Sequence, residues 1–350
     1  MERFINCVYK IVFGRTLAVV LMIALQILVL VGSFTYLGIK YPFVWETMNF
    51  LGGVVIIYII NRDEPPEFKL SWIIPLCLFP VFGALIYVFI VGNFGGIGLK
   101  KKLGRRVRET EGMLIRSEET EAAIQKCPEV FKGFAYYMEN SAGFPVYHNS
   151  VARYYPLGED KFADLIVELK KAEKYIFLEY FIIERGIMWD TILDILKEKV
   201  KEGVEVRVMY DGMCSILLLP YNYPKELESF GIKAKMFAPI VPFLSTTQNN
   251  RDHRKIVVID GKTAFTGGVN LADEYINQVE RFGHWKDVAV KVTGDAVRSF
   301  TIMYLQMWNV SEQGSENYEA YVKNIVYEEP LYHDGFVIPY GETPTRSTEV

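Results

Sequence analysis

The 350-residue sequence has few cysteines, and none of them is paired at a metal-binding or redox spacing. The four cysteines are scattered along the chain, at Cys7, Cys77, Cys127 and Cys214. Zinc sites usually show closely spaced cysteine pairs, and disulfide-stabilised domains contain far more cysteine for their length. We therefore predict no disulfide bonds and no zinc or other metal site.

The sequence also lacks a nucleotide-binding glycine loop and a strong excess of charge of one sign. Gly261-Lys262-Thr263 matches the end of a P-loop, but the position five residues earlier, where that loop needs a glycine, holds Ile256. The formal net charge is only -4, which predicts no particular class of partner. No low-complexity tract or internal repeat is visible either.

The sequence does contain long apolar runs, by contrast. Hydrophobic residues make up 51% of the chain, and most of the surplus lies in its first quarter. Thr16–Ile39 and Leu70–Gly92 contain no charged residue, and Tyr41–Ile60 contains a single glutamate. Because about 20 apolar residues span a bilayer, we predict a membrane anchor of two or three transmembrane helices in residues 1–93.

A basic cluster follows the last apolar run and predicts the orientation of the anchor. Its members are Lys100, Lys101, Lys102, Arg105, Arg106 and Arg108. Basic residues beside a membrane span remain on the cytoplasmic side, so we expect a multi-pass protein of the cell membrane whose remaining chain, from residue 94 onward, is cytoplasmic. The cluster would also attract anionic lipid headgroups, by about 1 kcal/mol per basic residue. Residues 94–144 are interpreted as a charged, helical connector at the membrane surface.

From residue 145 onward the pattern changes to alternating strands and helices. Tyr175–Ile183 is rich in β-branched and aromatic residues, and Val204–Tyr210 alternates as a strand after an intervening helix. Two further strands are expected on either side of the turn Asp260-Gly261. This order predicts an α/β domain at residues 145–325, in which helices flank a mixed sheet.

The densest group of chemistry-bearing residues lies in Asn249–Tyr275, NNRDHRKIVVIDGKTAFTGGVNLADEY. It contains His253, Lys255 and Asp260 at the spacing H-x-K-x-x-x-x-D. In a strand, His253 and Lys255 would project to the same side and could hold one phosphodiester. The imidazole could then attack phosphorus and form a phosphohistidine, while the ammonium stabilises charge on the phosphoryl oxygens.

Three nearby residues are candidates for binding the substrate phosphate. Gly267 and Gly268 would let the backbone approach a ligand closely, and the amide of Asn270 can donate to a phosphate oxygen.

Asp260 is the third member of the catalytic motif. Its position in an alternating strand nevertheless places it opposite His253, which favours a role in capping the Asp-Gly turn.

This segment resembles the HKD motif of the phospholipase D superfamily, including the Gly-Gly-x-Asn that follows the motif. Other segments resemble pieces of bacterial cardiolipin synthases: YIFLEYFII at Tyr175–Ile183, GHWKDVAV at Gly283–Val290, and NRDEPPEFKLSWIIPLCLFPVFGALIYVF at Asn61–Phe89. The resemblance implies that His253 takes the phosphatidyl group from one phosphatidylglycerol, releasing glycerol, and passes it to the hydroxyl of a second one. It implies no cofactor.

Two acidic residues are expected to support the site. By position, the resemblance implies that Asp287 orients the His253 imidazole through its second nitrogen. Glu179 lies within an apolar strand, where an unpaired carboxylate would be costly, so we expect it to have a buried partner.

Cardiolipin synthases usually carry two HKD motifs, whereas the residues after Asn270 contain no second H-x-K. Residues 326–350 resemble the linker that leads to a second domain. We expect a chain truncated to its first HKD domain; a half that forms a homodimer and an inactive membrane protein are the alternatives. A phospholipase D-type hydrolase, with water as acceptor, is a further alternative. The predicted anchor favours a phospholipid substrate over nucleic acid.

Overall fold

The computed structural model describes residues 15–78, 83–84, 87, 94–214, 218–239, 251–327 and 335–341. The chain forms two compact units. The first comprises Met1–Gly98 and Ile240–Asn250, and the second comprises Leu99–Pro239 and Arg251–Val350.

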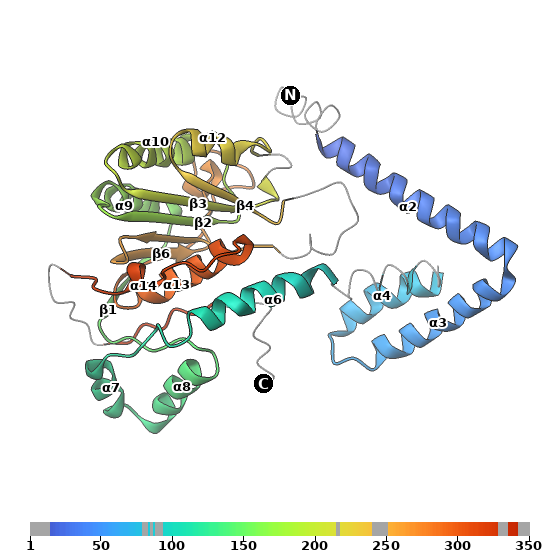
Figure 1. Cartoon of the computed structure of the whole chain (residues 1–350), viewed down its shortest axis with the longest axis horizontal. Coiled ribbons are helices and arrows are strands. Elements are labelled where there is room, and N and C mark those ends of the chain that lie inside the picture. Colours follow the sequence, from blue (N-terminus) through green and yellow to red (C-terminus); the bar gives the residue numbers. More distant parts are fainter. Residues whose placement is uncertain are drawn as a thin grey trace. The chain divides into compact units, whose positions relative to one another are not determined.

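The first unit contains three described helices, α2 (Arg15–Lys40), α3 (Pro42–Ile60) and α4 (Pro66–Leu78) (Figure 1). Prolines at the starts of α3 and α4 suit the first helical turn, where a backbone N–H would have no partner within the helix. A small buried cluster includes Ile59 and Leu76, beside which the rings of Trp72 and Tyr87 meet edge to face at 5.3 Å.

Among the described residues, no helix combines the length and the apolar character that a membrane crossing requires. The predicted anchor of two or three transmembrane helices is therefore wrong. An uncharged run in a sequence does not fix the length of one continuous helix, and α4 illustrates this with only 13 residues. That length is about 20 Å, whereas the hydrocarbon core of a bilayer is about 30 Å thick. Much of the remainder of the third predicted span lies outside the described residues.

The second unit is built on a seven-stranded sheet in the order β1-β7-β6-β5-β2-β3-β4. Its strands are β1 (Ser150–Tyr155), β2 (Tyr175–Tyr180), β3 (Glu205–Asp211), β4 (Lys233–Phe237), β5 (Ile256–Ile259), β6 (Thr263–Gly267) and β7 (Ala289–Gly294). Strands β2, β3 and β4 are parallel, and the other neighbours pair antiparallel. The predicted α/β domain with a mixed sheet is thus confirmed.

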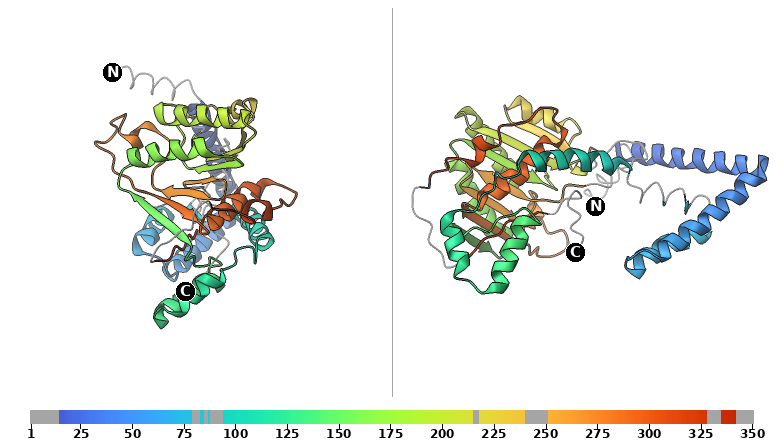
Figure 2. Two further views of the ribbon diagram at one scale, coloured as in Figure 1. Left: turned by 90° about the vertical axis from the view of Figure 1, so that its left-hand side faces the viewer. Right: turned by 60° about the horizontal axis from the view of Figure 1, so that its bottom comes forward.

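Helices cover both faces of this sheet (Figures 1 and 2). One face packs against α9 (Gly158–Lys171), α10 (Ile187–Lys201) and α12 (Tyr223–Ser229), and the other against α6 (Phe94–Glu109), α13 (Val297–Trp308) and α14 (Glu319–Val322). Strand β2 shows why both layers are needed. Ile176 and Leu178 join the core on the α10 side, whereas Phe177 joins the core on the α13 side, and every residue of β2 is buried.

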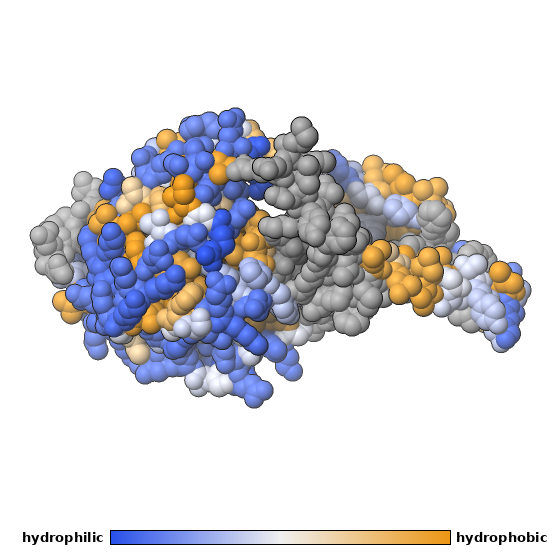
Figure 3. All heavy atoms as spheres, turned by 90° about the horizontal axis from the view of Figure 1, so that it is seen from above, coloured by the Kyte–Doolittle hydropathy of each residue, from blue (hydrophilic) through white to orange (hydrophobic). Residues whose placement is uncertain are grey.

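The smaller elements of this unit are α7 (Glu118–Gln125), α8 (Glu129–Asn140) and the 3-10 helices η2 (Asp273–Ile276) and η3 (Asn309–Ser311). Helix α7 begins with Ser117, whose hydroxyl accepts the backbone N–H of Thr120 at 3.2 Å. Seen from the side of α10 and α12, hydrophilic residues cover much of the surface of this unit (Figure 3). The helices on this side, α9, α10 and α12, direct apolar residues toward the sheet.

A tight turn joins β5 to β6 as expected from the Asp-Gly pair. Asp260 and Gly261 both have positive φ, 52° and 67°, and the N–H of Lys262 closes the turn by donating to the carbonyl of Ile259 at 3.0 Å. Left-handed conformations at both central residues match a type I′ turn, whose twist suits antiparallel strands. The turn fixes the register of β5, and β5 in turn follows directly on the H-x-K residues.

Candidate active site

His253 and Lys255 lie in the segment 251–255, which precedes β5 rather than forming part of it. Their side chains nevertheless share one side, where both contact the ring of Phe181. The ring centroids of His253 and Phe181 are 4.8 Å apart, and the Lys255 Nζ lies 5.4 Å from the Phe181 centroid. The structure therefore brings the imidazole and the ammonium together, although not through strand geometry.

His253 and Lys255 differ in solvent exposure, and both have a lowered pKa. His253 is exposed, and partial burial together with the positive charge of Lys255 lowers its pKa below 6.5. Lys255 is only 6% exposed, and burial lowers its pKa to about 8. Its Nζ also donates to the carbonyl of His253 at 2.6 Å. At neutral pH the histidine is therefore mainly a free base and the lysine mainly a cation.

Asp260 lies at the opposite end of β5. Its carboxylate accepts hydrogen bonds from the backbone N–H groups of Glu173, Lys174 and Tyr175, at 2.7 to 2.8 Å. Seven residues along an extended chain span roughly 20 Å, which is too far for Asp260 and His253 to share a phosphate. The structure therefore does not bring Asp260 together with the other two motif residues, and places it at the start of β2 instead.

Gly267 ends β6 and Gly268 follows it, and both lie against residues at or just before the start of β7. A β-carbon on Gly267 would overlap the carbonyl of Val288, and one on Gly268 would overlap the carboxylate of Asp287. Gly267 also has a φ of 142°, which side-chain-bearing residues rarely adopt. In this structure the glycines thus make room for Asp287 and its neighbour.

Asn270 is buried, and its amide already has two protein partners. The side-chain oxygen accepts the backbone N–H of Ile182 at 3.0 Å, and the side-chain nitrogen donates to the hydroxyl of Tyr275 at 2.9 Å. One amide N–H is left over from these two bonds. Asn270 therefore ties the end of β2 to the segment after β6, and a phosphate contact through that N–H stays a prediction.

Asp287 acts electrostatically on Lys255: burial lowers the pKa of that lysine, and the charges of Asp252 and then Asp287 partly oppose the lowering. The carboxylates that raise the pKa of His253 are those of Asp252 and Asp211 instead. The expected orientation of His253 by Asp287 accordingly stays a prediction.

Glu179 has the buried partner that its position requires. It is fully buried, and its Oε1 lies 2.6 Å from the Nη2 of Arg254. Burial raises the pKa of Glu179 well above its ordinary value, and the charge of Arg254 opposes that rise. Sequence reasoning missed Arg254 and Asp252 because neither residue is part of the H-x-K-x-x-x-x-D motif. Their charge at alternating positions was the available signal.

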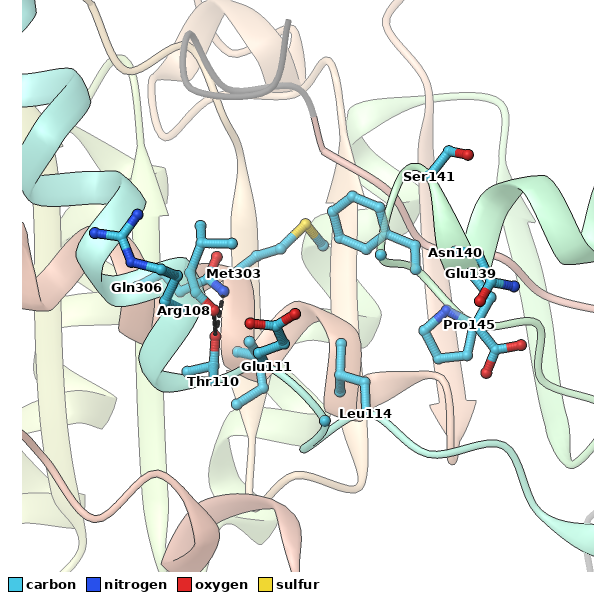
Figure 4. Close-up of a pocket in the computed structure, with 15 residues that line it drawn as sticks. Arg108, Thr110, Glu111, Leu114, Glu139, Asn140, Ser141, Pro145, Met303 and Gln306 are labelled. Atoms are coloured by element: carbon cyan, nitrogen blue, oxygen red, sulfur yellow. Dashed lines mark hydrogen bonds between the residues drawn. The ribbon is translucent and has the colours of Figure 1, made fainter. Parts of the chain in front are cut away.

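A cavity of about 480 Å³ lies elsewhere in this unit, between the ends of α6 and α8 and helix α13 (Figure 4). Met303 and Leu114 line it together with Glu111, and Gln306 donates to Thr110 at 2.6 Å on its wall. None of the predicted site residues lines this cavity.

Comparison with known proteins gives two family matches. Residues 165–283 match the PLD-like domain of cardiolipin synthases, and residues 51–92 match the N-terminal segment of the phospholipase D-nuclease family. The first match contains both His253 and Lys255. These matches confirm the resemblance to the phospholipase D superfamily, and to its cardiolipin synthases, that the H-x-K motif predicted.

Several bacterial proteins are similar over most of this chain. An uncharacterised protein of Streptococcus mutans serotype c is 44% identical over 295 residues, which are 84% of this chain and 63% of that protein. The cardiolipin synthase of Alkalihalophilus pseudofirmus is 34% identical over 73% of this chain and 50% of its own length. That of Geobacillus sp. is 33% identical over 79% and 57%. The chain thus spans from half to less than two thirds of these relatives.

Proposed function

We propose that this chain provides one catalytic half of a phosphatidyltransferase, which makes cardiolipin and glycerol from two molecules of phosphatidylglycerol. The observation that carries the proposal is the pairing of an exposed His253 with a buried Lys255 on one side of segment 251–255. Both residues lie within the match to the cardiolipin synthase domain. Cardiolipin synthases are also among the proteins to which the chain is similar.

In the first step, an imidazole nitrogen of His253 attacks the phosphorus of phosphatidylglycerol. The nitrogen–phosphorus bond forms, the bond to the glycerol oxygen breaks, and that oxygen takes up a proton as glycerol leaves. The lowered pKa of His253 keeps the lone pair free for this attack. Lys255 donates to the phosphoryl oxygens as their negative charge grows.

In the second step, the hydroxyl of another phosphatidylglycerol attacks the phosphatidyl-histidine. The new phosphorus–oxygen bond replaces the nitrogen–phosphorus bond, and the hydroxyl proton is transferred to a base. One phosphodiester is exchanged for another. The reaction therefore needs no nucleotide, and the residues of the site call for no other cofactor.

The proton needed by the leaving glycerol comes from a second imidazole in this proposal. A second HKD half would supply it, either as another copy of this chain in a homodimer or as a further domain. A symmetric pair would place two copies of His253 at one site. Activity that rises with the square of the protein concentration would identify the homodimer.

The substrate lipid places the site at a membrane surface, and α6 offers a face that suits anionic headgroups. Its Leu99 and Leu103 pack toward the core of the second unit. Its exposed residues include the cations Lys100, Lys101, Lys102, Arg105 and Arg108. We therefore assign a surface association at the cytoplasmic face of the cell membrane, through residues within the connector 94–144.

Purified chain in vesicles of radiolabelled phosphatidylglycerol provides the test. Labelled cardiolipin with release of glycerol is the expected result, and His253→Ala should abolish it. His148→Gln removes an imidazole before β1 and should leave product formation unchanged. Labelled phosphatidic acid would instead identify a hydrolase. Absence of product at every protein concentration and also after a second HKD half is added, or product from His253→Ala, would refute the proposal.

A further inference from the structure

We infer that Arg254 is a positioning residue, held by two buried carboxylates so that His253 and Lys255 face the substrate. The inference rests on the proposed function of His253 as the nucleophile. It concerns a side chain that points away from the reaction and does not touch the phosphate.

The segment 251–255 needs a positioning side chain because it lies outside the hydrogen-bonded ladder of the sheet. β5 begins at Ile256, which pairs with Glu179 of β2, and the described ladder does not extend to His253. Ladder hydrogen bonds would otherwise set which side each residue faces. Side-chain contacts have to perform that task here.

Alternate residues of the segment face opposite sides. His253 and Lys255 contact Phe181, whereas Arg254 reaches Glu179 from the other side. The Nε of Arg254 also lies 3.4 Å from the Oδ1 of Asp252, which is buried as well. One guanidinium therefore bridges a carboxylate of β2 and a carboxylate within its own segment.

A second anchor acts just before His253. The Oδ2 of Asp211, at the end of β3, accepts the backbone N–H of Asp252 at 2.9 Å. The Oδ1 of Asp211 lies 3.3 Å from the Nη1 of Arg251. His253 is thus fixed on both sides, to β3 through Asp252 and to β2 through Arg254.

The buried acids Glu179 and Asp252 depend on Arg254 for a positive charge beside them. Glu179 is fully buried, and apart from the ion pair its carboxylate oxygens accept no hydrogen bond from the described residues. Loss of the guanidinium would leave two buried acids without their cation, a far less favourable state than loss of the whole pair. The segment would then be expected to shift so that these acids reach water, and His253 would move with it.

Arg254→Met tests the inference, with Arg116→Met as the matched control. Arg116 is a similarly buried arginine that also pairs with two acids, Glu121 of α7 and Glu139 of α8, and none of the three belongs to the sheet or to segment 251–255. Arg254→Met should lower kcat by about 100-fold, the scale of a misplaced catalytic group, with a nearly unchanged KM. Arg116→Met should leave both constants as they are.

The double variant Glu179→Leu/Arg254→Met separates positioning from general damage. It replaces the buried ion pair with apolar side chains, which interiors tolerate better than a single unpaired charge. We expect it to recover at least about tenfold in kcat over Arg254→Met, because segment 251–255 no longer has to expose an acid. An equal or greater loss in the double variant would overturn the inference.

A readout independent of turnover distinguishes this inference from the proposed function. The chain has only four histidines, so the carbon-labelled His253 ring can be assigned by NMR through His253→Gln. Its pKa should lie below 6.5 in the wild type, rise toward 6.5 in Arg254→Met and return in the double variant. If the wild type makes no cardiolipin, this titration still tests the positioning. An unchanged pKa and kcat in Arg254→Met would overturn the positioning alone.

Discussion

The carboxylate of Asp287 occupies the space that any side chain on Gly268 would need. A β-carbon at position 268 would overlap both the Oδ1 and the Cγ of Asp287. Burial lowers the pKa of Lys255, and the charges of Asp252 and then Asp287 partly oppose that effect, so the glycine determines where one charge close to that lysine can lie. The Gly-Gly pair after the H-x-K motif therefore has a structural reason within the chain itself.

Gly268→Ala should consequently be destabilising. The new methyl group forces the side chain of Asp287 aside and breaks its hydrogen bond from the N–H of Val288, which should cost about 1 kcal/mol of unfolding free energy. Gly314→Ala is the control, because nothing lies within 4 Å of its added β-carbon. Chemical denaturation of both variants measures the difference. Equal stabilities would show that Asp287 does not need this space.

The pH dependence of kcat/KM should be bell-shaped. The acid limb should lie below pH 6.5, where His253 becomes protonated and loses its lone pair. The alkaline limb should lie near pH 8, where Lys255 loses its charge. Initial rates measured from pH 5 to 10 provide the profile.

Lys255→Arg should move only the alkaline limb to higher pH, because a guanidinium stays charged throughout this range. The maximal rate should fall as well, since an arginine does not reproduce the position of the ammonium. An alkaline limb unchanged by this substitution would assign that limb to another group.

Asp260→Ala should affect stability more than chemistry. Its carboxylate accepts three backbone hydrogen bonds at the start of β2, and loss of the acceptor should cost about 3 kcal/mol. Well below the unfolding temperature, kcat should stay within about tenfold of the wild type. A folded Asp260→Asn protein with normal stability and no activity would instead place Asp260 in the reaction.

Lys161 should make stability increase with pH. It is buried, its Nζ donates to the hydroxyl of Tyr180, and burial lowers its pKa to about 7. Above pH 7 the folded lysine is neutral while the unfolded one is still protonated, so unfolding takes up a proton. The unfolding free energy should therefore rise by up to about 1.4 kcal/mol per pH unit toward pH 10.

Lys161→Met should flatten this dependence, because the buried methionine has no proton to gain. Lys201→Met, at an exposed position, should leave the slope as it is in the wild type. Urea unfolding at a series of pH values between 7 and 10 measures all three slopes. A wild-type slope that Lys161→Met does not reduce would assign the effect to another group.

The sequence was informative where local rules determine the outcome. The H-x-K spacing predicted that His253 and Lys255 share a side, and Asp-Gly predicted the turn after β5. Sequence reasoning failed where residues far apart in the chain come into contact. The start of β5 and the pairing of Arg254 with Glu179 depend on the alignment of β2 with β5. A local sequence pattern does not predict that alignment. The uncharged run Leu70–Gly92 was misleading for a similar reason, because composition does not give the length of a helix and α4 ends at Leu78.

The most direct test of the account is to look for the covalent intermediate on His253. The chain is mixed with labelled phosphatidylglycerol, quenched within a turnover at alkaline pH, where phosphohistidine survives, and its peptides are analysed by mass spectrometry. The account predicts a phosphatidyl group on the peptide that contains His253 and none in His253→Gln. Cardiolipin formation without that adduct, or with an adduct on a different residue, would contradict it.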